Sequence, residues 1–305
     1  MYSISFVLFF LTVNIHGSVL VVDQVETNQV RPVNFQEVKS SKILFFDMSQ
    51  VDSVTKGIYF EMYPGKHANE GKPVLYPTEE WENWATFAYN TVLQHPNGTF
   101  FMYYDCISAD KVRNLIRFTC LATSKDGISW IKPILNIAMY NNNTKNNIVW
   151  PLSDAAGKYK YIEPGTVFID TNPNIHESEK WKMLVRMNNK DNTDTDTYVL
   201  SSSDGIHWEE MFDAPSLNSS DTQNIAWYDN EIDEYIIFMR IDDANPVEHS
   251  GPHGDCAGLN DRISPDIRRI GRCTTKDLSD FGCEPKGSKE APVVFSFDSV
   301  DPPCM

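Results

Sequence analysis

The sequence lacks the short motifs that mark several large classes of enzyme. It contains no Gly-x-Gly-x-x-Gly turn, no phosphate-binding loop, no Gly-x-Ser-x-Gly elbow and no His-Glu-x-x-His pair. Nucleotide-dependent enzymes, serine hydrolases with that elbow and zinc proteases therefore lose their usual sequence support. We expect no cofactor and no bound metal ion.

Positive charge is scarce as well. The 305 residues include 26 Lys and Arg against 42 Asp and Glu, which gives a formal net charge of −16. Nucleic-acid backbones and anionic membranes repel such a chain, so neither is expected as a partner, and a neutral ligand or a cation fits better. Beyond the N-terminal stretch, no apolar run approaches the length that spans a bilayer.

Residues 1–18 have the pattern of a secretory signal peptide. A short apolar run is followed by polar residues and by the small pair Gly17-Ser18, and the run is too short to cross a membrane. We therefore expect a secreted, extracellular protein. A polar segment over 19–41 would precede one folded domain over 42–305.

Cysteine usage and glycosylation sequons agree with secretion. Six cysteines are compatible with three disulfides, whose connectivity the sequence does not give. The segment over 242–266 places histidines near Cys256, but we expect that cysteine to pair with Cys273 or Cys283 rather than to bind metal. Three sequons in polar, turn-like surroundings are predicted glycosylation sites: Asn97, Asn142 and Asn218.

One turn sequence recurs along the chain. "SKDGISW" at 124–130 returns as "SSDGIHW" at 202–208, and a degenerate copy, "TKDLSDF", stands at 275–281, at a spacing of roughly 75 residues. In such a turn the Asp side chain accepts backbone hydrogen bonds, and Gly permits a positive φ. We therefore expect the repeated turn to be structural rather than catalytic.

Each copy of the turn follows alternating strand patterns. Inner strands are predicted at 90–94, 165–170 and 223–229, each followed by a Pro-, Asn-, Asp- or Gly-rich turn and a second strand. Helical periodicity is almost absent. Sheets of three or four strands at near-constant spacing predict an all-β fold of the β-propeller type.

About three blades are visible before the chain reaches "PVVFSFDSVDPPCM", which has the pattern of the start of a fourth blade. A propeller needs a closed circle of blades. Either the sequence is truncated, or the N-terminal region "KILFFDMSQV…GIYFEMYP" completes a blade. We expect truncation.

Several segments resemble glycoside hydrolase family 32. They are "CLATSKDGISWIKPIL", "NNIVW", "LFFDMSQV…KPVLYPTEEWEN" and "DTQNIAWYDNEIDEYIIFMR". The resemblance extends from about Lys42 to the C-terminus and is greater to a family-32-like branch than to the true invertases. It implies a five-bladed propeller. In the superfamily of families 32, 43 and 68, each of the first three blades contributes one acidic residue to the active site. The resemblance therefore also implies three such residues here, which would act as nucleophile or base, as transition-state stabiliser and as general acid.

The match at these acidic positions is partial. Glu163 in "IEPGTVF" corresponds to the stabiliser, which family 32 places in an Arg-Asp-Pro-x-Val-Phe motif, and Asp221 in "SDTQNI" corresponds to the general acid. Both lie three residues before matching strand positions. Glu82 in "WEN" is the candidate from the first blade, although it is out of step with the other two.

Paired carboxylates hydrolyse a glycosidic bond when one protonates the leaving oxygen and the other attacks the anomeric carbon or activates water. We therefore predict Glu163 and Asp221, with Glu82 as a third, as catalytic residues acting on a neutral carbohydrate. Candidate substrate-binding residues are the possible sugar-stacking rings Trp81, Trp84 and Trp150, together with Arg240.

Three other interpretations remain open. Acidic residues at strand starts often only cap turns or solvate a rim, and Arg240 can simply pair with the surplus of carboxylates. The protein could be a non-catalytic secreted propeller that binds glycan or protein. A sialidase would need an arginine cluster and a tyrosine nucleophile, which the sequence does not identify.

Overall fold

The computed structural model describes residues 68–109, 115–152, 162–188, 195–218, 221, 223–242, 268–284 and 290–295. The predicted signal peptide, the segment over 19–41, and two cysteines, Cys256 and Cys304, lie outside the described residues. The chain divides into two compact units, Met1–Gly71 and Lys72–Met305. In the first, the described part is the short 3-10 helix η1 (Ala68–Gly71).

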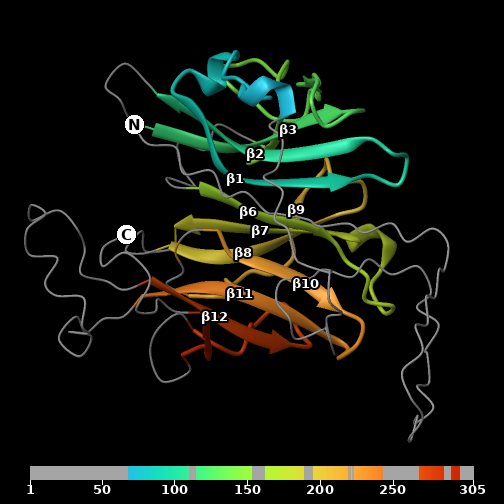
Figure 1. Ribbon diagram of the computed structural model, residues 1–305, viewed down its shortest axis with the longest axis vertical. Coiled ribbons are helices and arrows are strands. Elements are labelled where there is room, and N and C mark those ends of the chain that lie inside the picture. The colour runs from blue at the N-terminus through green and yellow to red at the C-terminus, as the bar shows by residue number, and fades with distance from the viewer. Residues whose placement is uncertain are drawn as a thin grey trace, which may run out of the picture. The chain divides into compact units, whose positions relative to one another are not determined.

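The described part of the second unit contains three antiparallel sheets built from consecutive strands (Figure 1). The first is β1 (Ala85–Gln94), β2 (Phe100–Ala109), β3 (Leu115–Ser124) and β4 (Trp130–Ile131), with β5 (Ile148–Trp150) also paired to β3. The second is β6 (Ile162–Ile169), β7 (Trp181–Asn188), β8 (Thr195–Ser202) and β9 (Glu209–Glu210). The third is β10 (Ile225–Asp229), β11 (Glu234–Asp242), β12 (Arg268–Thr275) and β13 (Val293–Phe295).

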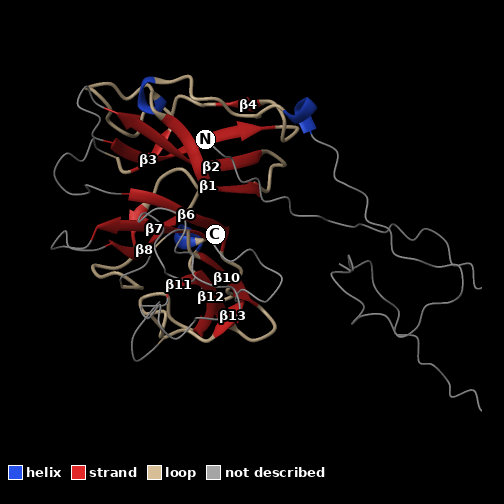
Figure 2. Cartoon of the chain, turned by 60° about the vertical axis from the view of Figure 1, so that its left-hand side comes forward, coloured by secondary structure: helices blue, strands red, loops and turns tan. Residues whose placement is uncertain are grey.

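Helical structure in the described part of this unit is limited to the 3-10 turns η2 (Glu80–Glu82) and η3 (Glu177–Glu179), as Figure 2 shows. None of the described helices is long and apolar enough to cross a membrane. The prediction of an all-β fold is confirmed, because the alternating strand patterns and hairpin turns of the sequence form these sheets.

The first strands of the three sheets lie side by side. The amide of Val167 in β6 donates to Thr91 Oγ1 in β1 at 3.3 Å, and Thr166 Oγ1 donates to the carbonyl of Asn224, just before β10, at 2.9 Å. Sheets that present their first strands to one another in this way have the arrangement of β-propeller blades. The predicted number of five blades stays a prediction.

Two apolar cores hold the sheets together. One lies between the first and second sheets and includes Tyr103, Met183 and Trp208. The other lies between the second and third sheets and includes Leu184 and Ile237. Met183 and Leu184 are neighbours in β7, so they point to opposite faces of the second sheet and serve one core each.

The repeated turn has the hydrogen bonds expected of a structural element. Asp126 Oδ1 accepts from the amides of Ile128 and Ser129 at 2.8 and 2.7 Å. Asp204 Oδ1 accepts from the two equivalent amides in the second copy, at 2.8 and 2.9 Å. These bonds lower the pKa of Asp126 to about 2.

For Asp204 burial raises the pKa, but hydrogen bonds from His207 and from the turn amides outweigh burial and bring it to about 2. The tryptophan that ends this copy, Trp208, is buried edge-on against Tyr103 of the first sheet, with ring centroids 6.0 Å apart. The second copy of the turn therefore joins two sheets.

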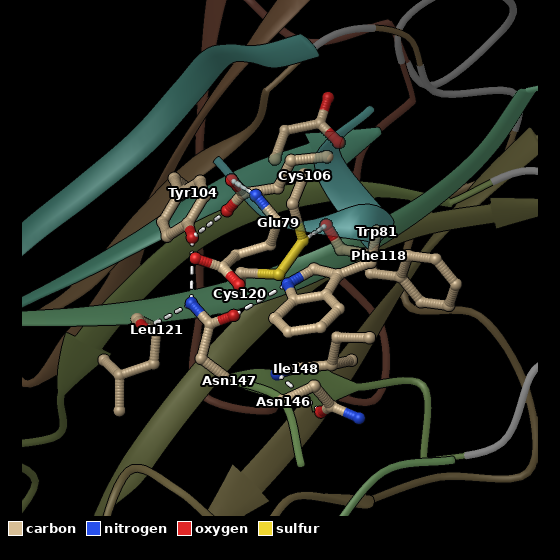
Figure 3. Close-up of a disulfide and its surroundings, with 12 residues drawn as sticks. Glu79, Trp81, Tyr104, Cys106, Phe118, Cys120, Leu121, Asn146, Asn147 and Ile148 are labelled. Carbon is tan, nitrogen blue, oxygen red and sulfur yellow. Dashed lines mark hydrogen bonds between the residues drawn. A yellow bond between two sulfur atoms is a disulfide. The ribbon is translucent and has the colours of Figure 1, made fainter. Parts of the chain in front are cut away.

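Two disulfides are present among the described residues. Cys106 and Cys120 join β2 to β3, as Figure 3 shows, and Cys273 pairs with Cys283. The expectation that Cys256 pairs with Cys273 or Cys283 is therefore wrong. The degenerate turn after β12 folds the chain back, so that the Cα of Cys283 lies 6.4 Å from that of Cys273, a separation that a disulfide spans.

Candidate active site

Three acidic residues and three arginines form an alternating series of ion pairs where the first strands of the sheets begin. We call this series the charge chain; its members, in order of contact, are Asp105, Arg117, Glu163, Arg186, Asp221 and Arg240. They come from all three sheets. Carboxylates and guanidinium groups alternate along the series, so each ion lies beside one of opposite sign.

The second strands of the three sheets contribute one member each, at the same register. In each sheet, one residue of the second strand pairs with the first residue of the repeated turn; in the second sheet, Trp181 pairs with Ser202. The member of the charge chain lies five residues after that paired residue in every case: Asp105, Arg186 and Arg240. The turn thus sets the register that brings these three side chains to one end of the sheets.

Glu163 and Asp221 are brought together by Arg186. Glu163 lies in β6 directly opposite Arg186 in β7, and its Oε2 is 2.6 Å from Arg186 Nη1. Asp221 Oδ1 lies 3.1 Å from the same nitrogen. Because the 2.6 and 3.1 Å contacts share that atom, these two carboxylate oxygens are no more than 5.7 Å apart.

The three carboxylates of the charge chain become more exposed from Asp105 to Asp221. The side chain of Asp105 is fully buried, that of Glu163 is 7% exposed and that of Asp221 is 39% exposed. Arg117 contacts Asp105 closely and also donates to Glu163 Oε1 from Nη1 at 2.6 Å. The site is therefore closed at its Asp105 end and open to solvent at Asp221.

The buried end holds a carboxyl group that titrates near neutral pH. Burial raises the pKa of Asp105 to about 6, against the opposing effect of its hydrogen bonds and charge contact with Arg117, and the negative charge of Glu163 contributes to the rise. Such a group holds or releases a proton close to physiological pH.

Glu82 is not brought together with Glu163 and Asp221. It is fully buried in η2, where Oε1 accepts from the Tyr104 hydroxyl at 2.5 Å and Oε2 contacts Lys132 Nζ at 2.5 Å. Tyr104 and Asp105 are neighbours in β2, so their side chains point to opposite faces of the first sheet. Glu82 therefore lies on the face away from the charge chain.

The predicted stacking tryptophans occupy three different environments. Trp81 lies on the same face as Glu82, where its Nε1 donates to Asn147 Oδ1 at 2.8 Å (Figure 3). Trp150 is buried in the core between the first two sheets. Trp84 is 51% exposed just before β1. Arg240 is a member of the charge chain through its close contact with Asp221.

The predicted glycosylation sites are accessible. Asn97, Asn142 and Asn218 are all exposed, and the first two stand in turns of the first sheet and its following loop. Among the residues that the structure describes, no group of three or more His, Cys, Asp and Glu side chains is arranged to hold a metal ion.

Sequence reasoning missed Asp105, Arg117 and Arg186. A signal for two of them exists, since aligning "FFMYYDCI", "WKMLVRMN" and "YIIFMRID" on the repeated turns places Asp105, Arg186 and Arg240 at one position. Three arginines, Arg117, Arg186 and Arg240, do meet the acidic residues here, and each guanidinium group contacts a carboxylate of this protein.

Comparisons with known proteins place the chain beside several solved structures. No protein-family model matches the sequence, and no curated protein matches it. One similar structure belongs to the GH130 family of mannoside phosphorylases, which contains glycoside hydrolases that target β-1,2 mannosidic linkages in Candida mannan. It has a TM-score of 0.44 and 13% identity, over 80% of this chain and 64% of that chain.

Two further similar structures are a sucrose-6-phosphate hydrolase from Lactobacillus gasseri and a glycosyl hydrolase from Bacteroides ovatus. The first has a TM-score of 0.42 and 12% identity, over 71% of this chain and 36% of that chain. The second has a TM-score of 0.40 and 12% identity, over 69% of this chain and 51% of that chain. This chain thus spans less than two thirds of each, and the likeness assigns no activity to it.

Proposed function

We propose that the charge chain is the site at which this protein binds a neutral carbohydrate and hydrolyses a glycosidic bond with Glu163 and Asp221. The observation that carries the proposal is their meeting at Arg186 Nη1, through contacts of 2.6 and 3.1 Å. Glycoside hydrolysis needs two carboxyl groups at one bond, about 5–5.5 Å apart in retaining enzymes and further apart in inverting ones. The separation of at most 5.7 Å between the Glu163 and Asp221 oxygens agrees with the shorter separation, that of retaining enzymes.

The alternation of charges supports a neutral carbohydrate as the ligand. A sugar hydroxyl both donates and accepts, so it can donate to a carboxylate such as Glu163 while it accepts from a guanidinium such as Arg186. The charge chain has equal numbers of acidic and basic side chains. The polypeptide as a whole has a formal net charge of −16, and this negative charge does not favour an anionic substrate.

Substrate entry requires one contact to give way, because Arg186 lies between the two carboxylates. Its contact with Asp221 is the longer, at 3.1 Å against 2.6 Å for Glu163, and Asp221 is the more exposed partner. We therefore expect the sugar to enter between Arg186 and Asp221, leaving Glu163 held by Arg117.

A screen of hydrolysis with matched variants tests the proposal. Purified protein is offered sucrose, p-nitrophenyl α-L-arabinofuranoside and p-nitrophenyl β-D-mannopyranoside, and the released sugar is measured. Glu163→Gln and Asp221→Asn should each lower turnover by roughly 10²- to 10⁴-fold, as loss of an acid–base group does. Glu177→Gln, an exposed acid in η3 of the second sheet, should leave turnover unchanged. Unchanged turnover in Glu163→Gln would remove Glu163 from the site.

A second candidate function is carbohydrate binding without hydrolysis. It is favoured by the pairing of every carboxylate in the charge chain with a guanidinium, because such pairing stabilises the ionised form and occupies the oxygens that hydrolysis uses. Sugar binding by the wild-type protein with no release of product from any of the three substrates would select this function.

A further inference from the structure

One exposed aromatic ring lies directly beside the charge chain. Phe87, in β1, pairs across the sheet with Asp105 in β2, so the two side chains share a face of the first sheet. The Phe87 side chain is nevertheless 49% exposed, whereas Asp105 is fully buried. An apolar ring half open to solvent at a charged site is a candidate ligand surface.

Phe87 stands where the packing between the first two sheets ends. Further along the same face of β1, Thr91 and Leu93 pair with Tyr103 and Phe101, and both of these aromatic partners are buried in the core between the sheets. At Phe87 the apolar packing gives way to the charge chain, since the Arg117 guanidinium carbon lies over one face of the ring, 5.9 Å from its centroid. Arg117 in turn contacts Glu163.

The backbone around Phe87 is held in an unusual shape. The pairing of β1 with β2 shifts register between Phe87 and Thr91, which marks a bulge, and Tyr89 within it has a φ of 67°. An aromatic residue in this left-handed region is rare, and such strain occurs where the surroundings fix a functional conformation. The Tyr89 ring meets that of Phe87 edge-on, with centroids 6.0 Å apart and an interplanar angle of 77°.

We propose that Phe87, supported by Tyr89, is the platform on which the sugar ring of the ligand stacks. The C–H groups on the apolar face of a sugar pack against the electron-rich face of an aromatic ring. The hydroxyl groups around the rim of that sugar then reach Arg117 and Glu163. This inference rests on the proposed function and names the residue that holds and orients the sugar beside the carboxylates.

Binding and hydrolysis are measured separately to test the platform. The full-length protein is titrated calorimetrically with sucrose, methyl α-L-arabinofuranoside and methyl β-D-mannopyranoside. For the sugars that bind, Phe87→Ala should raise Kd roughly three- to tenfold, while Phe87→Trp should keep Kd within about twofold of wild type. Val92→Ala is the matched control, because Val92 is an exposed apolar residue of the same strand on the opposite face, and its Kd should not change.

The outcomes separate this inference from the proposed function. Weaker binding in Phe87→Ala, with no hydrolysis by the wild type, supports the platform and removes the catalytic proposal. Hydrolysis by the wild type, with equal Kd and KM in Phe87→Ala, supports catalysis and overturns the platform. Absence of binding by the wild type to all three sugars overturns the platform as well. Urea unfolding of each variant verifies that it is folded.

Discussion

Asp105 shows how one residue can hold a charge that the fold disfavours. Its side chain is fully buried, and Arg117, through its ion pair and hydrogen bonds, partly offsets the loss of water around it. The fold tolerates this carboxyl group because it holds the guanidinium that also contacts Glu163. We therefore interpret Asp105 as a residue that positions Arg117 in the charge chain.

The raised pKa of Asp105 predicts a pH-dependent stability. Burial raises that pKa from the ordinary 3.8 to about 6, so between pH 4 and 6 the folded protein binds a proton that the unfolded chain has released. The stability of the wild type relative to Asp105→Asn should therefore fall as pH rises from 4 to 7, by about 2 kcal/mol at 1.36 kcal/mol per pKa unit. Urea unfolding at pH 4 and pH 7 measures the difference.

Asp126 provides the control with the opposite sign. Hydrogen bonds from the turn amides lower its pKa to about 2, so the wild type should gain stability relative to Asp126→Asn as pH rises from 2 to 4. A stability difference between wild type and Asp105→Asn that did not change with pH would contradict the assignment of a neutral-range carboxyl group to Asp105.

At the scale of the elements, local chemistry made the turns and strands predictable. The Ser-x-Asp-Gly turn and the hairpin residues specify their structure over a few neighbouring residues, and the turns and hairpins form where the sequence predicts them. The face on which a strand residue lies was harder to predict. Tyr104 and Asp105 are neighbours in β2 and point to opposite faces, and Glu82 contacts Tyr104. The sequence of η2 does not predict which of these two faces Glu82 will lie on.

Two glycines of the repeated turn differ in what surrounds them. Gly127 and Gly205 both have positive φ, 73° and 76°. A Cβ at Gly127 would meet nothing within 4 Å, whereas one at Gly205 would lie 2.5 Å from the Tyr103 hydroxyl oxygen and 3.0 Å from the Trp181 ring. The second copy of the turn is therefore packed against the first sheet, and the first copy is open.

Alanine substitution should separate these two effects. Gly127→Ala should cost about 1 kcal/mol of unfolding free energy for the left-handed backbone alone. Gly205→Ala should cost about 1–3 kcal/mol more, because the new methyl group is forced into a packed interface. Urea unfolding of both variants gives the comparison. Equal losses in the two would mean that the second turn does not join the sheets.

At the scale of the whole second unit, the charge chain links three sheets by polar contacts beside the apolar cores. Arg117 belongs to the first sheet, Glu163 and Arg186 to the second, and Arg240 to the third. Its assembly was not predictable from sequence, because each contact joins strands far apart in the chain and depends on how the sheets face one another. The sequence supplied Glu163 and Asp221, but not the arginine between them.

Removal of that central arginine should destabilise the folded protein. Arg186→Ala removes the 2.6 Å contact with Glu163 and the 3.1 Å contact with Asp221. Breaking a mostly buried ion pair costs about 3 kcal/mol or more, which urea unfolding resolves. Lys180→Ala, which breaks the exposed pair with Glu177, should cost less than about 1 kcal/mol. Similar small losses in both variants would show that the charge chain does not hold the sheets together.

The common register of Asp105, Arg186 and Arg240 has a consequence for how a repetitive fold acquires a specific site. The three sheets share the pairing that aligns their second strands with the repeated turn. At the aligned position the first sheet has an acidic residue, whereas the second and third sheets both have arginine. Three identical side chains there would repel one another, so the site is built from the divergence of the copies and not from what they share.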